Sequence, residues 1–163
     1  MGGHIGAYPL HLAAVRNDVS ALRRNIQLFG WESVETLSAE GKTPLQVAVA
    51  LGRKESVSFL VSRANLNVNN SNGTPLIIAS RKGDIEILKI LLSAGAKPNH
   101  FDARRNTALF YAAKGGFSKC VSELIKYGAE AGWRNLDGKT ALDLSSEKHH
   151  DTTNILRRYE VTR

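Results

Sequence analysis

Short apolar blocks, each introduced by Thr or Tyr, recur along the chain at nearly constant intervals. They begin at Tyr8, Thr43, Thr74, Thr107 and Thr140, so the intervals are 35, 31, 33 and 33 residues. Between these blocks lie further apolar runs and polar stretches rich in Gly and Asn. Self-similarity at a fixed period of this length predicts a stacked array of supersecondary units, here five of them.

The unit that begins at Thr74 predicts two short helices. The Thr74 hydroxyl can cap a helix N-terminus, and Pro75 is tolerated in the first turn because its missing N–H has no helical partner there. Gly83 predicts the end of this helix in a left-handed conformation. Apolar residues at helical spacing over 85–92 predict a second helix, which ends near Gly95. The Asn-rich stretch 65–73 predicts an extended turn or hairpin between units.

These motifs resemble the ankyrin repeat. The resemblance rests on Thr-Pro-Leu at a fixed period, on a Gly nine residues after the Thr (Gly52, Gly83 and Gly116), and on Gly95-Ala96 and Gly128-Ala129 after the second helix. It implies an all-α solenoid of about five helix-turn-helix repeats with β-hairpin connections, in one domain over residues 1–163. The expected repeats are 3–37, 38–68, 69–101, 102–134 and 135–163.

Several positions depart from the family pattern. Repeat one has Tyr8 in place of Thr and about two extra residues around 27–31, which predicts an enlarged second helix or loop. Arg63 and Arg105 stand where repeats two and four would carry Gly. Ser145-Ser146 replaces the Ala pair of repeat five. Because the terminal repeats each have one face in water, we interpret them as caps around three central repeats.

Composition and charge narrow the class of partner. The 163 residues are 42% apolar, contain one Cys and carry a net charge of +7, which favours acidic partners. No Lys/Arg run is longer than a pair, so a positive surface has to be assembled by the fold. No apolar run approaches the ~18 residues of a membrane helix, and the N-terminus lacks a basic signal-peptide region. We expect an intracellular protein, cytoplasmic or nuclear, that is a monomer.

No combination of residues predicts an enzyme, a cofactor or a metal site. Two Gly-Lys-Thr triplets lack the preceding Gly of a phosphate-binding loop, because Thr36 and Trp133 occupy those positions. Adjacent His149 and His150 project differently from a helix, and no other Cys or His completes a ligand set. Cys120 lies among apolar residues of a second helix and has no neighbouring base, which predicts an unreactive core thiol.

Two further polar positions have structural interpretations. The resemblance implies a structural hydrogen bond for His11. Asn67 and Asn99 occupy the hairpin Asn position and predict turn hydrogen bonds. In this family such Asn residues are sometimes hydroxylated.

The resemblance also implies that partners contact the hairpin tips and the exposed ends of the first helices, which line a concave groove. At these positions the charge is mostly positive, with aromatic residues among it, a composition typical of interface hot spots. The expected partner-binding residues are Arg16, Lys42, Leu51, Arg81, Lys82, Phe101, Arg104, Asn106, Lys114, Trp133, Arg134 and Lys139.

Two functions follow from this surface, and the sequence leaves both open. The first is a non-catalytic adaptor or scaffold that binds a protein with an acidic or mixed surface. The alternative is an anionic ligand, namely a nucleotide, an oligonucleotide or a phosphoinositide headgroup, with Phe101 and Trp133 for stacking. A plain alternative is that these Lys and Arg residues are only solvated surface.

Overall fold

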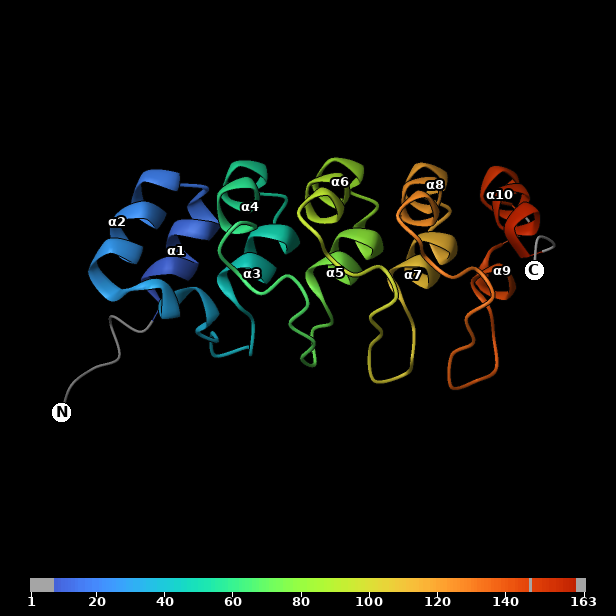
Figure 1. Cartoon of the computed structure of the whole chain (residues 1–163), viewed down its shortest axis with the longest axis horizontal. Helices are drawn as coiled ribbons and strands as arrows, with labels where there is room; N and C mark the ends of the chain where they lie inside the picture. Colours follow the sequence, from blue (N-terminus) through green and yellow to red (C-terminus); the bar gives the residue numbers. More distant parts are fainter. Residues whose placement is uncertain (1–7, 147, 161–163) are drawn as a thin grey trace. The chain divides into compact units, whose positions relative to one another are not determined.

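A computed structural model describes residues 8–146 and 148–160, and every regular element in that part of the chain is a helix (Figure 1). The helices are α1 (Pro9–Arg16), α2 (Val19–Phe29), the 3₁₀ helix η1 (Trp31–Glu35), α3 (Pro44–Ala50), α4 (Lys54–Leu60), α5 (Pro75–Lys82), α6 (Ile85–Ser93), α7 (Ala108–Lys114), α8 (Ser118–Lys126), α9 (Ala141–Leu144) and α10 (His150–Glu160). The all-α prediction is therefore confirmed.

The predicted β-hairpin connections are not confirmed. The described residues contain no strand, and their one isolated bridge joins Phe101 to Thr107. Asx side chains explain why ladders do not form, because they accept the loop amides themselves. Asn135 Oδ1 accepts from the amides of Asp137 and Lys139 at 3.0 Å each, and backbone hydrogen bonds from Asn135 N to Lys139 O and from Gly138 N to Asn135 O close the loop.

Threonine side chains cap the first helices α3, α5 and α9, as predicted for Thr74. Thr43 and Thr140 form reciprocal capping boxes with the third helical residue, and Thr74 accepts a hydrogen bond from Ile77 N at 3.1 Å. These bonds satisfy amides that have no helical acceptor. Thr107 is buried and makes no such side-chain cap.

A left-handed residue ends α5 and turns the chain into α6. Gly83 has φ 70°, as predicted, and its N–H and that of Asp84 bond back to α5. At the end of α1 the same conformation is adopted by Asn17, with φ 56°. Asn tolerates this region better than most residues. Asn17 stands nine residues after Tyr8, at the position where three later repeats carry Gly, and it adopts the same left-handed conformation.

The chain forms two compact units, which meet in sequence at Asn65 and Leu66. In unit 1, α1 packs on α2 and α3, and α4 packs on α2 and α3. Leu22, Leu45 and Leu60 are fully buried there. The second helix of the first repeat is enlarged as predicted, since α2 has 11 residues and is followed by η1.

In unit 2 the first helices α5, α7 and α9 pack in sequence, and the second helices α6, α8 and α10 form another layer (Figure 1). Residues 75–80 of α5 are all buried, because the helix is covered by neighbours on several sides. On α8, Cys120 is 1% exposed, and burial raises the pKa of its thiol to about 11. This confirms a core thiol with little thiolate character.

The hairpin Asn residues bond to the next loop, a partner that the predicted turn hydrogen bonds did not include. Asn67 Oδ1 accepts from Lys97 N at 2.9 Å. Asn99 Oδ1 accepts from Glu130 N at 2.9 Å, and its amide donates to Gly128 O. These bonds join segments about 30 residues apart, so they fix successive loops in unit 2 to one another.

Candidate functional site

The predicted partner-binding residues lie at helix C-termini and in the loops that precede first helices. Arg16 and Lys114 end α1 and α7, Arg81 and Lys82 end α5, and Leu51 caps α3. Most are exposed, and Lys42, Asn106 and Trp133 are half-buried. The remaining predicted residues, all in loops of unit 2, are Phe101, Arg104, Arg134 and Lys139.

Cations at the ends of α5 and α7 have a structural role of their own. The last carbonyls of a helix carry partial negative charge, which Lys and Arg in the final turn offset. This effect accounts for a basic residue at each position. It does not account for the aromatic and polar groups that surround these cations in unit 2.

A hollow of about 260 Å³ lies beside the end of α7 in unit 2. Its wall includes three of the predicted residues, Arg104, Asn106 and Lys114. Asn106 accepts a hydrogen bond from the Asn135 side-chain amide at 3.0 Å, which joins the loops on its two sides. The other lining residues are Phe110, Tyr111, Asn135, Asp137 and Leu144.

A fixed aromatic–cation pair extends this hollow toward α5. The Arg81 guanidinium lies over the Tyr111 ring, 4.6 Å from its centroid. The Tyr111 hydroxyl donates to Asp102 Oδ2 at 2.5 Å, and Asp102 Oδ1 accepts from the amides of Arg104 and Asn106. The ring and the loop before α7 therefore hold one another, and Arg81 is placed on them. Tyr111, in the middle of α7 and half-buried, and Asp102, in the preceding loop, were not among the predicted site residues.

A second cluster lies at the tips of loops 101–107 and 133–139, which precede α7 and α9. The rings of Phe101 and Trp133 are 5.4 Å apart and tilted by 32°. Arg105 lies over both rings, at 5.6 Å from Phe101 and 5.0 Å from Trp133. The Trp133 indole N–H donates to Arg105 O at 3.0 Å. Arg105 was noted from sequence only as a departure from Gly, and it was not among the predicted site residues.

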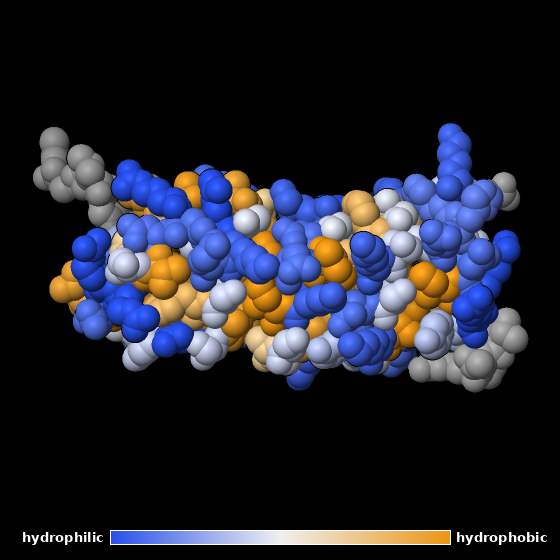
Figure 2. Space-filling model, turned by 90° about the horizontal axis from the view of Figure 1, so that it is seen from above, coloured by the Kyte–Doolittle hydropathy of each residue, from blue (hydrophilic) through white to orange (hydrophobic). Residues whose placement is uncertain are grey.

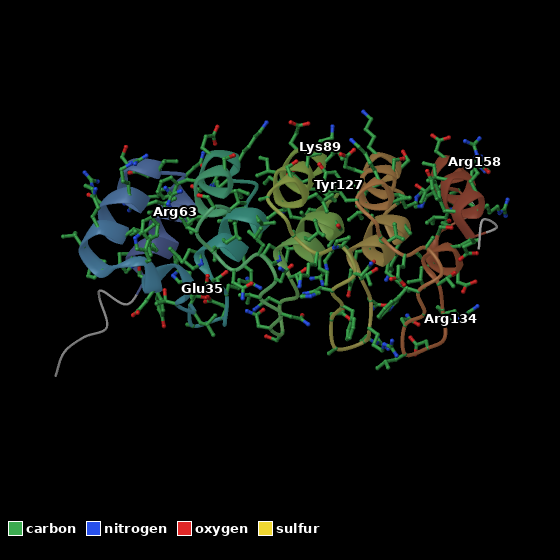
Figure 3. The ribbon with its side chains drawn as sticks, viewed as in Figure 1. Glu35, Arg63, Lys89, Tyr127, Arg134 and Arg158 are labelled. Atoms are coloured by element: carbon green, nitrogen blue, oxygen red, sulfur yellow. The ribbon has the colours of Figure 1, made fainter. Side chains whose placement is uncertain are left out.

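Two other cations of these loops are already engaged within the protein. Arg104 lies 3.9 Å from Asp137 in an exposed pair, which contributes at most about 1 kcal/mol. Arg134 donates from Nη1 to Gly138 O at 2.7 Å. Figure 3 shows Arg134 in the loop before α9, on the side of unit 2 opposite Lys89 of α6. Loops 101–107 and 133–139 and the C-terminal ends of α5 and α7 thus form one face of unit 2, which we call the loop face.

The opposite side of unit 2 carries its second helices. Figure 2 shows this side from above, where hydrophilic side chains cover much of the surface and hydrophobic ones lie between them in smaller groups. Lys89 and Lys119 are exposed there. These lysines provide a natural control for charge on the loop face.

Unit 1 has a separate, more apolar hollow of about 410 Å³. Tyr8, Leu12, Val15 and Leu51 line it and are each 37–49% exposed. Lys42 also lines it, and Lys42 O accepts a hydrogen bond of 2.7 Å from the buried His11. This confirms the structural role of His11, and burial lowers the pKa of its imidazole. Leu51 and Lys42 are brought together here, whereas Arg16 does not line the hollow.

The described residues contain no group of three or more His, Cys, Asp or Glu that could hold a metal ion. His149 packs instead against Gly116, where a Cβ atom would lie 2.5 Å from its ring. None of the described helices is long and apolar enough to span a bilayer. The loop face presents cations, aromatic rings and amide groups.

Comparison with known proteins gives consistent matches. A family model for ankyrin repeats, in three copies, matches residues 10–102 and 99–162. The ankyrin repeat domain of Bcl-3, a member of the IkappaB family, superposes with a TM-score of 0.83 over 93% of this chain and 72% of that one, at 27% identity.

Longer proteins contain similar segments. Synphilin-1 of Mus musculus is 29% identical over 93% of this chain, which corresponds to 16% of its own length. Ankyrin repeat and SOCS box protein 11 of Homo sapiens is 33% identical over 65% of this chain and 33% of its own length. The chain thus spans a third or less of these relatives.

Proposed function

Because the chain belongs to the ankyrin-repeat family, we propose that it binds an acidic segment of a protein partner through the loop face of unit 2. Ankyrin repeats generally mediate protein–protein interaction and are typically non-catalytic. The acidic partner and the basic surface are specific to this proposal. In the family such positions line a groove, and the proposal assigns the groove of this chain to the two loops and the ends of α5 and α7.

The observation that carries the proposal is the hollow beside α7, which combines Arg104 and Lys114 with the stacked Arg81–Tyr111 pair. A guanidinium fixed on a ring loses less side-chain freedom when it binds an anion. The hydrogen-bonded loops of the loop face give this surface a defined shape before binding. Solvated surface cations would need no such support.

The apolar hollow of unit 1 suits an apolar side chain of the same class of partner. Its exposed Leu12, Val15 and Leu51 line the same hollow. Together they form an apolar patch, which is larger than the single exposed apolar residues that are scattered over most protein surfaces. This supports a mixed partner, with apolar as well as acidic side chains. Lys42, which lines the same hollow, adds positive charge.

The test begins with the capture of partners from a cell extract on the immobilised chain, followed by mass spectrometry. The affinity of the purified partner is then measured for a double charge reversal, Lys114→Glu with Lys139→Glu. Both side chains are exposed. Arg134 is avoided because its side chain bonds to Gly138 and its loss could alter the loop.

The matched control is Lys89→Glu with Lys119→Glu, which changes the net charge equally on the second-helix side. We expect the loop-face variant to weaken binding by more than about tenfold, since it loses an attraction and adds a repulsion. The control should change it by less than about twofold. Equal effects of both variants would mean that only bulk electrostatics is involved. A steep loss of binding to single-stranded oligonucleotides with salt would favour the anionic-ligand alternative.

A further inference from the structure

Arg105 adopts a backbone conformation that few residues with a side chain accept. Its φ is 60°, and it stands at a loop position where the ankyrin pattern has Gly. A left-handed conformation is costly for a residue with a Cβ and nearly free for Gly. Strain of this kind is often retained where a side chain has a function. The strained backbone at Arg105 therefore indicates that its side chain has a role that Gly could not fill.

The side chain is held on two aromatic rings at the loop tips. The guanidinium carbon is 5.0 Å from the Trp133 centroid and 5.6 Å from that of Phe101. Trp133 donates to Arg105 O at 3.0 Å, and Phe101 O accepts from the Asn69 side chain at 2.6 Å. Three successive loops of unit 2 therefore fix the position of this one guanidinium.

The N–H groups of this guanidinium have no acceptor among the described residues. Arg104 faces Asp137, Arg134 donates to Gly138 O, and Arg63 donates to Phe59 O, so other arginines of the chain are engaged. Arg105 is exposed and stacked, yet its edge remains open. A planar fork of donors with a fixed orientation matches a carboxylate or a phosphate group.

We propose that Arg105, supported by Phe101 and Trp133, is an oxyanion receptor that selects a carboxylate-bearing side chain of a peptide. This inference rests on the proposed function and adds the residue that determines its specificity. A phosphorylated side chain presents the same oxyanion chemistry and would bind in the same way. The partner is a peptide rather than a nucleic acid, because Asp102 and Asp137 lie close by and would repel a continuous phosphate backbone.

The test measures binding of a short fluorescent peptide that alternates glutamate and leucine. Companion probes carry glutamine or phosphoserine in place of glutamate, and a single-stranded oligothymidine is the nucleic-acid probe. The variants are Arg105→Lys, which keeps the charge without the planar fork, Arg105→Gln and Arg105→Gly. Lys89→Gln removes one charge from α6 and serves as the matched control.

We expect the glutamate peptide to bind at least about tenfold more tightly than the glutamine peptide. Arg105→Lys and Arg105→Gln should each reduce this affinity by about tenfold, and Lys89→Gln should leave it within about twofold. Arg105→Gly should keep or raise the thermal midpoint, because Gly relieves the backbone, while binding falls as for Arg105→Gln. Loss of binding would then not be due to misfolding.

Three results would overturn the inference: full binding by Arg105→Lys, equal binding of the glutamate and glutamine peptides, or tighter binding of oligothymidine with the same dependence on Arg105. Tighter binding of the phosphoserine peptide would support the receptor and identify phosphate as the oxyanion it prefers. If the captured partner depends on Lys114 and Lys139 but not on Arg105, this inference alone fails. If it depends on none of them, the proposed function fails as well.

Discussion

The turn between α5 and α6 allows a quantitative test of the packing in unit 2. Gly83 has φ 70°, and a Cβ built there would lie 2.5 Å from two carbons of the Phe117 ring, inside any normal carbon–carbon contact. Gly95 has φ 99°, and its Cβ would meet nothing within 4 Å. Both positions therefore penalise Ala through the backbone, but only Gly83 adds a steric clash.

We expect Gly95→Ala to lower the free energy of unfolding by about 1–2 kcal/mol, the price of one left-handed residue with a Cβ. Gly83→Ala should lower it by that amount plus about 1–3 kcal/mol, because Phe117 must leave its position. Urea denaturation followed by helical circular dichroism measures both, with each variant compared to the unmodified chain. Equal losses would show that Phe117 does not pack on this turn as described.

Three further predictions concern single side chains. Thr43→Ala should lower the free energy of unfolding by about 1 kcal/mol, and Thr43→Ser should restore it, because the hydroxyl forms a capping box. A thiol reagent should modify Cys120 slowly in the native chain near pH 8 and quickly in urea, since its pKa is raised to about 11 by burial. Burial lowers the pKa of His11, so the unfolded chain binds a proton at this residue more readily than the folded chain does. The free energy of unfolding should therefore fall as the pH drops below the ordinary pKa of 6.5. Urea titrations at several pH values should show a weaker pH dependence for His11→Gln.

The fold was largely predictable because its signals are local and repeated. A capping Thr, a Pro in the first turn and a left-handed Gly each act within a few residues, and the 33-residue period repeats them. Asn17 shows the limit of such matching, since it adopts the Gly conformation without the Gly. The lack of strands in residues 8–146 and 148–160 could not be read from spacing, because there Asn135 and Asp102 accept loop amides through their side chains.

The sequence predicted a region for the candidate site, and that this region binds a partner stays a prediction. The C-terminal ends of first helices and their preceding loops follow from the repeat register, which is why Lys114 and Arg104 were both among the predicted residues that line the hollow beside α7. Tyr111 and Asp102 were missed because their contact joins a helix to a loop through side-chain rotamers, which sequence spacing does not specify. Arg105 was visible as an exception to the Gly pattern, but only its φ and its stacked rings indicate a role.

The most direct test of the account is the footprint of a captured partner on the chain, measured by amide hydrogen exchange of the free and bound protein. We expect protection in the loops 101–107 and 133–139 and at the C-terminal ends of α5 and α7. The second helices α6 and α8 should exchange at the same rate in both states. Protection confined to α6 and α8, with the loops unchanged, would contradict the assignment of partner binding to the loop face.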